Sequence, residues 1–403
     1  MKVESFTAAI LQKMSGIGKS QFKFIVHIVH LFLSMRGRKN YLMMARYGTY
    51  CEQSYRQNFE KDFEKDFDFK AMNRQLITDY CGKELIWLFD PSYISKSGKS
   101  TPGTGYFWSG CAGRPKWGLE LSALAVGDIE NHTAMHYHAT RTQFVKGEES
   151  LLMYYAKLIC NQAETLQKIS KVMCFDAFFS KYPFINSICG AGFTLISRMA
   201  CNTYMRYAYG GLQKAGRGRP KEYDGKIDTK NVSTKHFKII KSDNDEIVYE
   251  GIGHIRCLER WCKIIIVNTL KEGKVHKAFI YFSTDVNMVG EQIYQYYRLR
   301  YQIEFLFRDA KGFLGLEDSQ SRQENALDFH FNISLSTLNI AKAMHWLAVP
   351  KQERGAFSMT DIKTQYINEL VLDRIISIYG KDPSVEKLNP KIRDLYQLGR
   401  IAA

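Results

Sequence analysis

Two short apolar runs, each followed by an aspartate, limit the folds open to this chain more than any other feature of its sequence. The run Leu85–Phe89 precedes Asp90 and Pro91, and the run Val172–Phe175 precedes Asp176. Short uninterrupted apolar runs bounded by turn-forming residues are typical of buried strands. We therefore expect two buried strands that each end on a carboxylate.

The elements around these runs predict an α/β fold. Strands are expected first and helices later, an order that favours a mixed sheet flanked by helices. With 45% hydrophobic residues, the chain can fill a sizeable core and is neither disordered nor collagen-like. Further strands are expected at Trp117–Val126, Thr133–Thr140 and Phe193–Ser197, and helices at 148–169, Asn287–Lys311, Glu324–Leu347 and Thr360–Tyr379.

A change of pattern after residue 200 predicts a β-rich insertion into this sheet. Residues 201–277 contain alternating segments separated by Asn, Asp and Gly clusters, which is typical of short strands. The chain is expected to return to the main sheet at Ala278–Phe282. The expected strands of the insertion are Phe237–Ile240, Glu246–Glu250, His254–Leu258 and Cys262–Leu270.

The first 80 residues have helical spacing, and one segment among them resembles a DNA-binding motif. Asn40–Phe59 contains two short stretches around Gly48, as in a helix-turn-helix. In that arrangement Gln53, Tyr55, Arg56 and Gln57 would be able to face a groove of DNA. An ordinary helical subdomain fits the same residues, so both interpretations stay open.

The charge of the chain indicates its partner. The 403 residues contain 56 Lys and Arg against 41 Asp and Glu, a net charge of +15. A surplus of this size favours nucleic acid, with an anionic membrane surface as the second candidate. Residues 201–280 hold sixteen of the basic and nine of the acidic residues, a share of +7. Among them, Arg217 and Arg219 in Arg-Gly-Arg-Pro match the core of a minor-groove hook, although a plain basic loop fits equally.

Other residue types indicate where the protein is found. Nine cysteines without zinc-site spacing or a disulfide framework are expected to be free thiols, as in a reducing cytoplasm.

His136 and His138 would share one face of a strand, and a half-exposed sheet surface explains them better than a metal site. No apolar run approaches the ~20 residues of a membrane span, and the start lacks the order of a signal peptide. We expect a cytoplasmic protein with no membrane partner.

Three acidic residues are candidates for catalysis. Asp90 and Asp176 each follow a predicted strand, and Glu304 lies in a basic and aromatic helix. A carboxylate at the end of a buried strand is costly unless a cation pairs with it. An oxygen-only set of ligands favours Mg²⁺ or Mn²⁺. Two such ions about 3.5–4 Å apart would hold the attacking and leaving oxygens of a phosphodiester.

The helix around Glu304 adds cations and a ring to these acids. Tyr297, Arg300, Glu304 and Lys311 are separated by three, four and seven residues, so all four are expected to share one face of the helix. A salt-bridged amphipathic helix is the ordinary explanation of such a pattern. The acids elsewhere in the chain make a binding face for metal and phosphate the stronger interpretation.

These residues resemble a known family. The pattern Tyr-x₂-Arg-x₃-Glu-x₆-Lys is similar to the signature of cut-and-paste DDE transposases of bacterial insertion sequences, and Tyr297, Arg300, Glu304 and Lys311 match every position. The segments around Asp90 and Asp176 resemble the first two acidic motifs of that family. The resemblance covers roughly 84–347. One departure is Tyr301, where many members have tryptophan.

The resemblance implies a fold, an activity and roles for individual residues. It implies a ribonuclease-H-like fold with a β-rich insertion before the glutamate, in which Asp90, Asp176 and Glu304 bind two Mg²⁺ or Mn²⁺ ions. Tyr297, Arg300 and Lys311 would hold phosphates, and the ring of Tyr301 would stack on a base. The partners would be terminal inverted repeats and target DNA, bound by a homodimer associated with the bacterial nucleoid.

The boundaries that follow divide the chain into five parts. They are a helical DNA-binding subdomain (1–80), the first part of the catalytic core (81–200), the β-rich insertion (201–277), the second part of the core (278–347) and a C-terminal helical region (348–403). Two alternatives to a transposase stay open at this point. One is a ribonuclease-H-like DNA nuclease, and the other is a domesticated DNA-binding protein without catalytic activity.

Overall fold

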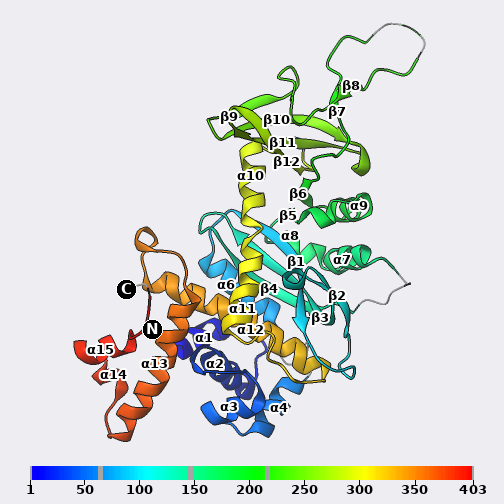
Figure 1. The fold of residues 1–403 in the computed structure, drawn as a ribbon. Helices are drawn as coiled ribbons and strands as arrows, with labels where there is room; N and C mark the ends of the chain where they lie inside the picture. The colour runs from blue at the N-terminus through cyan, green and yellow to red at the C-terminus, as the bar shows by residue number, and fades with distance from the viewer. Residues whose placement is uncertain are drawn as a thin grey trace.

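A single sheet connects the two halves of the molecule. The computed structural model describes residues 2–61, 67–143, 147, 149–213, 216 and 218–401. Within these residues twelve strands form one sheet, with the order β2-β3-β1-β5-β6-β12-β11-β10-β7-β8, while β4 pairs with β3 and β9 pairs with β10. In Figure 1, β1, β2 and β3 lie near the centre of the molecule, and β10, β7 and β8 lie at its upper end.

The central part of the sheet is mixed. Strand β1 runs antiparallel to β3 along its whole length but parallel to β5, and β5 runs parallel to β6. This arrangement, flanked by helices, confirms the predicted α/β fold and is consistent with the ribonuclease-H-like fold that the resemblance implies. The strands are β1 (Leu85–Ser95), β2 (Gly105–Ser109), β3 (Arg114–Asp128), β4 (Thr133–Arg141), β5 (Val172–Cys174) and β6 (Thr194–Met199).

Helices cover both faces of this central sheet. The indole of Trp87 donates a hydrogen bond to the carbonyl of Leu166 in α8, and Phe89 packs against Tyr155 of α7. Because side chains alternate along a strand, Asp90 points to the opposite face, which α11 covers. The helices on the first face are α7 (Leu151–Cys160), α8 (Ala163–Gln167) and α9 (Tyr182–Gly190), and α11 (Gln302–Phe313) lies on the second. Helices α6 (Phe69–Tyr80) and α12 (Glu324–Ala348) lie against β4.

Helix α12 lies against the edge of the sheet at β4. Asn339 accepts a hydrogen bond from the main-chain N–H of His136 and donates one to its carbonyl, and Asn332 does the same for Ala139. These two amides replace a neighbouring strand and protect the edge. His136 is therefore fully buried, so the expectation of a half-exposed surface is wrong for this residue, whereas His138 is half-buried as expected.

The insertion extends the central sheet. Strand β12 pairs with β6 through its second half and with β11 along its length, so the chain does return to the main sheet near Ala278. The expected strand Glu246–Glu250 continues to Ile255 as one long β10. The expected strand His254–Leu258 is wrong beyond Ile255, because Arg256–Leu258 form a 3-10 helix. The strands here are β7 (Met205–Ala208), β8 (Tyr223–Lys226), β9 (Lys238–Ser242), β10 (Glu246–Ile255), β11 (Arg260–Lys271) and β12 (Lys274–Ser283).

The helices at the two ends of the chain pack on one another. The ammonium of Lys363 donates to the carbonyls of Phe32 and Met35, and so caps the end of α2. Tyr55 is fully buried and bonded to His27, so it does not face a groove of DNA. The N-terminal helices are α1 (Val3–Gln12), α2 (Lys19–Ser34), α3 (Tyr41–Tyr47) and α4 (Glu52–Glu60), and the C-terminal ones are α13 (Met359–Ile378), α14 (Pro383–Glu386) and α15 (Pro390–Tyr396).

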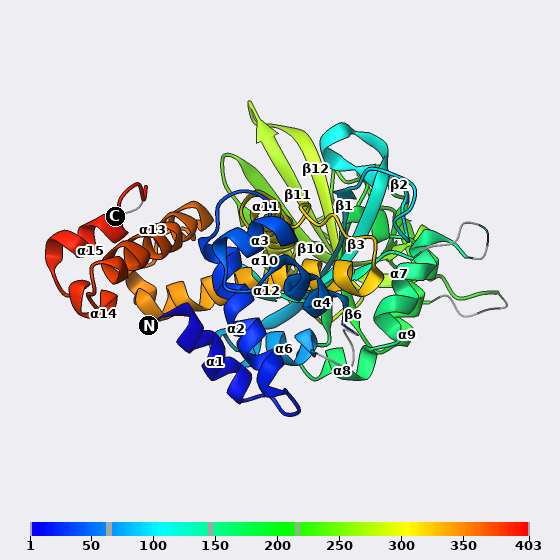
Figure 2. The same cartoon turned by 90° about the horizontal axis from the view of Figure 1, so that it is seen from below.

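Seen from below, α13, α14 and α15 project away from the rest of the molecule (Figure 2). None of the helices in the described part of the chain is both long enough and apolar enough to cross a bilayer.

Candidate active site

Asp90 lies where β1 loses one of its two neighbours. Strand β5 pairs with β1 only at Trp87 and Leu88, whereas β3 follows β1 to Ser95. The strand therefore does not end at Asp90, as the sequence had predicted, because a long antiparallel partner carries it past Pro91. Proline is tolerated there since one side of the strand is free of a ladder.

Asp176 follows β5 and begins a short 3-10 helix (Ala177–Phe179). The hydroxyl of Ser197 in β6 donates to the main-chain carbonyls of Phe175 and Asp176 and holds this turn in place. The hydroxyl of Tyr297 lies 3.4 Å from the Asp176 carboxylate. The second predicted acid therefore sits at the end of a strand parallel to the one that carries the first.

The third acid comes from the segment predicted as one long helix, which the structure breaks in two. Helix α10 (Gly290–Leu299) ends before Arg300, and α11 begins after Tyr301. Both residues keep right-handed helical angles, but Arg300 N–H bonds to Tyr297 and Ile303 N–H bonds to Arg300, three residues back in each case. The turn is tightened at this point. In Figure 1 α10 descends from the insertion and α11 continues beside the central sheet.

Arg300 connects the acids. Its side chain is almost fully buried, and its Nη2 donates to Glu304 at 2.9 Å. Burial acts to lower the pKa of the guanidinium, but Tyr297, Asp176, Glu304 and Asp90 together raise it above its ordinary value. The structure thus brings together Asp90, Asp176, Tyr297, Arg300 and Glu304, from segments that are up to 214 positions apart.

The electrostatics of Asp90 show how crowded this centre is. Burial raises the pKa of its carboxyl to about 7; Arg300 opposes the rise, while Glu304, Asp176 and Glu120 add to it. A buried carboxylate beside other carboxylates is stabilised by a further cation. The oxygen-only donors of Asp90, Asp176 and Glu304 fit Mg²⁺ or Mn²⁺ in kind. Among the described residues, however, no three His, Cys, Asp or Glu side chains lie close enough together to hold a metal ion. The carboxylate of Glu304 is bonded to Arg300.

Tyr301 and Lys311 complete the predicted set in different ways. Tyr301 is 43% exposed, and the Arg300 guanidinium stacks over its ring at 4.4 Å. Lys311 is half-buried, donates to the carbonyl of Tyr93 at 2.7 Å and lies 3.4 Å from Glu317. Lys311 therefore ties α11 to the end of β1, next to the strand segment that carries Asp90.

The predicted hook lies outside this centre. Arg217 is outside the described residues. Arg219 is exposed between β7 and β8, where it bonds to Glu222 at 2.7 Å. The structure does not bring it to the acids, and its contact with DNA stays a prediction.

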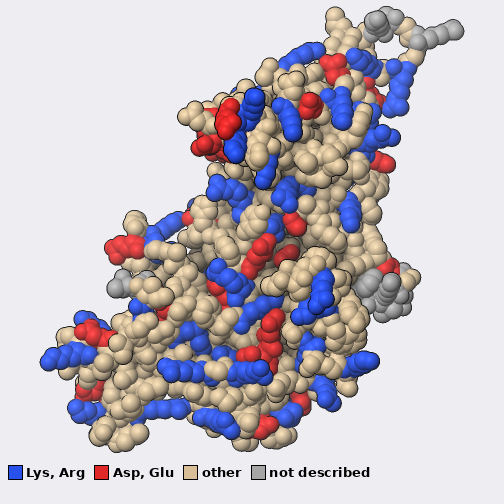
Figure 3. Space-filling view, in the orientation of Figure 1, with Lys and Arg blue, Asp and Glu red and all other residues tan. Residues whose placement is uncertain are grey.

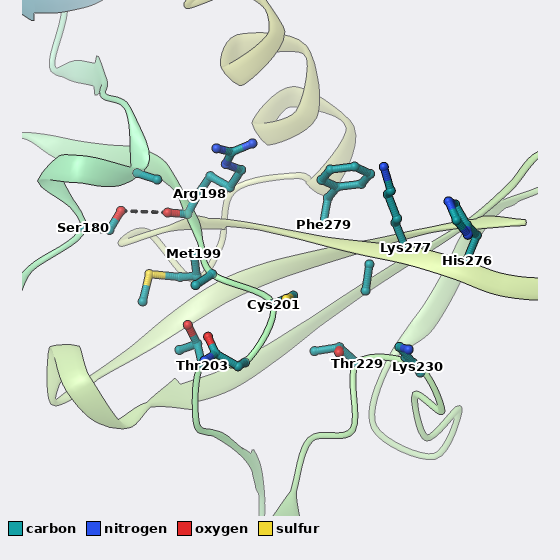
Figure 4. Close-up of a pocket in the computed structure, with 14 residues that line it drawn as sticks. Ser180, Arg198, Met199, Cys201, Thr203, Thr229, Lys230, His276, Lys277 and Phe279 are labelled. Carbon is teal, nitrogen blue, oxygen red and sulfur yellow. Dashed lines mark hydrogen bonds between the residues drawn. The ribbon is translucent and has the colours of Figure 1, made fainter. Parts of the chain in front are cut away.

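A groove beside Asp176 contains functional candidates that the sequence interpretation missed. The groove, of about 690 Å³, begins at Ala177 and Ser180 and continues along β6 and β12. Arg198, Phe279 and Lys277 project to the same side of these strands in Figure 4. Arg198 lies opposite Tyr281, whose ring contacts Tyr297. The segment from Gly190 to Arg198 resembles a strand of the transposase family, but the resemblance gave Arg198 no role. For Lys277 and Phe279, their alternation along a strand is the one signal of a shared face.

Basic and acidic side chains gather in separate groups on one side of the molecule. In the space-filling view, Lys and Arg side chains lie above and below a group of acidic side chains near the middle of the face (Figure 3). Lys and Arg side chains on both sides of a group of carboxylates would attract a polyanion to this face of the molecule.

Comparison with known proteins agrees with this geometry. Residues 157–340 match a family model described as a transposase DDE domain. The matched segment contains Asp176 and Glu304, whereas Asp90 precedes it. No curated protein matches the chain in sequence. Among solved structures, the chain is similar to a piggyBac transposase in a synaptic complex with hairpin DNA, with 11% identity over 98% of this chain and 81% of that chain and a TM-score of 0.42. That score is too low to assign roles. Residues 157–340 are thus similar in sequence to transposase DDE domains.

Proposed function

We propose that the protein is a DNA transposase that binds the terminal inverted repeats of an insertion sequence and cuts and rejoins DNA. One observation carries the proposal: a buried Arg300 lies among Asp90, Asp176 and Glu304, which come from three distant segments. Three carboxylates gathered without a catalytic role would only cost stability. The family match to 157–340 supports the same conclusion.

The three acids would hold two Mg²⁺ or Mn²⁺ ions. Such ions stabilise the charge that develops on the attacking and leaving oxygens of a phosphodiester. The carboxylates would hold these ions between the end of β5 and the start of α11. Glu304, which is half exposed at its side chain, would have to exchange its bond to Arg300 for this task.

The cations around the acids would bind the DNA backbone. Arg300 Nε is buried and, among the described residues, has no hydrogen-bond partner, so a shift that uncovers it would let it donate to a phosphate. Arg198 and Lys277 would hold further phosphates along the groove. The exposed ring of Tyr301 is placed to stack on a base. Two ends of an element must be joined, so the active form would be a homodimer on DNA.

The products of a reaction in vitro test this function. We expect the protein, with Mg²⁺ and DNA that carries the repeats flanking its gene, to release the element with free 3′-hydroxyl ends and to join them to a target plasmid. Gel analysis and sequencing of the junctions would identify both products.

Two other outcomes would contradict the proposal. Cleavage without preference for the repeats and without joining would indicate a ribonuclease-H-like nuclease. Tight binding of the repeats without any cleavage would indicate a domesticated DNA-binding protein.

A further inference from the structure

A second pocket lies on another face of α11 and takes no part in the centre described above. It has a volume of about 560 Å³ and lies between the turn from β3 to β4, helices α11 and α12, and the segment 351–357. On α11 it is lined by Gln302, Phe305 and Asp309, which repeat at three and four residues and so share one face. Glu304 lies on a different face. We call this space the α11–α12 pocket.

Basic side chains outnumber acidic ones around the α11–α12 pocket. The cations are Arg308, Lys342, Lys351 and Arg354, and the acids are Glu130 and Asp309. Asp309 is already bonded to Arg308 at 2.9 Å, and Glu130 accepts the main-chain N–H of Lys83 at 2.7 Å. The pocket therefore holds an excess of positive charge, which attracts an anion.

Lys342 carries one of these charges in a buried place. Its side chain is 4% exposed, and two of its three N–H groups donate to the hydroxyl of Thr133 and the carbonyl of Ala134. Both partners are uncharged. Burial lowers the pKa of the ammonium to about 8, although Asp309 opposes this change. An anion in the pocket would stabilise the charged form.

His345 adds a polar atom that lacks a partner. Its Nε2 is buried and, within the described part of the chain, accepts and donates no hydrogen bond. Burial lowers the pKa of the ring, and Arg354 and Arg400 lower it further, so the imidazole is neutral. A buried polar atom without a partner is costly unless water or a ligand satisfies it. A neutral imidazole can donate such a bond to an oxygen of an anion.

Aromatic rings lie among these cations. Phe305 is 41% exposed, and the guanidinium of Arg308 lies 4.7 Å from the centre of its ring. In two further pairs a cation lies over a ring, and these are Lys342 with Phe357 at 5.7 Å and Arg354 with Trp346 at 5.9 Å. Rings and guanidinium groups stack on nucleobases, and cations bind phosphates. The pocket thus offers both kinds of contact that a nucleotide uses.

We propose that the α11–α12 pocket binds one nucleotide, with its phosphate among Lys342, Lys351 and Arg354 and its base against Phe305. Neither a bare anion nor an apolar ligand would use both kinds of side chain. The volume lies within the range of about 300–1,000 Å³ that is typical of small-molecule sites. The nucleotide is either free or part of a DNA strand, and the second source rests on the proposed function.

An exposed row of side chains connects the acids to this pocket. Tyr301, Phe305 and Arg308 are separated by four and three residues and follow one side of α11. Tyr301 and Phe305 are 43% and 41% exposed, and the ring of Tyr301 lies against Arg300 among the acids. A single strand that leaves the acids would pass along this row into the pocket.

Binding of two labelled probes to the full chain in EDTA tests the site. The probes are fluorescent 2′-deoxyadenosine 5′-monophosphate and a single-stranded oligodeoxyadenylate of about eight nucleotides. Phe305→Ala and Lys351→Gln should each raise the dissociation constant of at least one probe ~5-fold or more. Tyr379→Ala and Lys391→Gln are the matched controls, because both residues are exposed in the C-terminal helical region; they should bind like the wild type.

The pattern of losses identifies the source of the nucleotide. Weaker binding of both probes indicates a site that takes the free nucleotide, whereas weaker binding of the oligonucleotide alone indicates a strand of DNA. Hydrogen exchange locates the contact, because amides of 351–357 should exchange more slowly when the probe is bound.

Two results would overturn the inference. One is equal binding of both probes by the wild type and the two pocket variants. The other is competition by inorganic phosphate as strong as that by the unlabelled mononucleotide, since the base would then not be recognised. Asp90→Asn should bind both probes like the wild type, so a failure of the proposed catalysis would leave this result unchanged.

Discussion

At the scale of the residue, the guanidinium of Arg300 has two roles. It supplies positive charge to Asp90, Asp176 and Glu304, and it lies against the rings of Tyr297 and Tyr301 at 5.7 and 4.4 Å. Such a buried cation offsets the repulsion among the three carboxylates. Its Nε has no hydrogen-bond partner among the described residues, and in the proposed function it would bind a phosphate once uncovered. Arginine suits this position because its planar fork binds several acceptors at fixed angles.

Replacement of Arg300 tests its role as counter-charge. Arg300→Gln should lower the free energy of unfolding by about 1–3 kcal/mol, because it leaves the half-buried carboxylates of Asp90 and Asp176 and the bonded carboxylate of Glu304 without their cation. Mg²⁺ should restore part of this loss by replacing the missing charge, and thermal unfolding with and without Mg²⁺ measures both effects.

Arg300→Lys is the matched variant. It keeps the charge, so its stability should fall less than that of Arg300→Gln and should respond less to Mg²⁺. If Mg²⁺ stabilised Arg300→Gln no more than the wild type, the acids would not form a cation site around this position.

At the scale of the element, local sequence patterns predicted what local interactions decide. The strands near Leu85 and Val172 follow from short apolar runs, and α12 and α13 begin and end close to the expected residues. The passage of β1 beyond Asp90 was not predictable in this way, because β3 pairs with it from more than twenty residues away. The break at Arg300 has no Gly or Pro to mark it. It coincides with the burial of Arg300 among acids from β1 and β5.

The same limit applies to the candidate site. The three acids and Tyr297, Arg300 and Lys311 could be proposed from motifs because each motif is local. Arg198 and Lys277 could not, because they face one groove only after β6 and β12 pair.

The contact between α12 and β4 predicts a loss of stability in acid. His136 lies in this contact, with Nε2 3.1 Å from Asn332, and burial lowers its pKa to about 3. Between pH 6.5 and about 3 the unfolded chain binds this proton while the folded chain does not. The free energy of unfolding therefore falls as pH falls, by up to about 1.4 kcal/mol per pH unit for this group.

His136→Gln should remove that contribution. At pH 7 the variant should lose about 1 kcal/mol through a poorer hydrogen bond, and between pH 6 and pH 4 its stability should fall less steeply than that of the wild type. His276→Gln, at an exposed position on β12, serves as control. Equal slopes for wild type and His136→Gln in chemical unfolding would show that His136 is not buried in its neutral form.

At the scale of the whole molecule, charge separates three regions with different partners. The part of the chain from 201 to 280 carries +7, and residues 359–401 carry only +1. Between them the acids lie on the face where β1, β5 and α11 meet. This distribution suits a protein that binds DNA across its centre and insertion and not through its C-terminal helices.

The central claim is that Asp90, Asp176 and Glu304 act as one catalytic centre. The most direct test is the rate of Mg²⁺-dependent cleavage at a repeat end by Asp90→Asn, Asp176→Asn and Glu304→Gln, with Glu291→Gln on the exposed start of α10 as control. Each of the three should bind the DNA end like the wild type but cleave it at least ~10³-fold more slowly, equivalent to about 4 kcal/mol of transition-state stabilisation. Glu291→Gln should cleave at the wild-type rate. Cleavage within ~10-fold of wild type by any of the three acid variants would contradict the account.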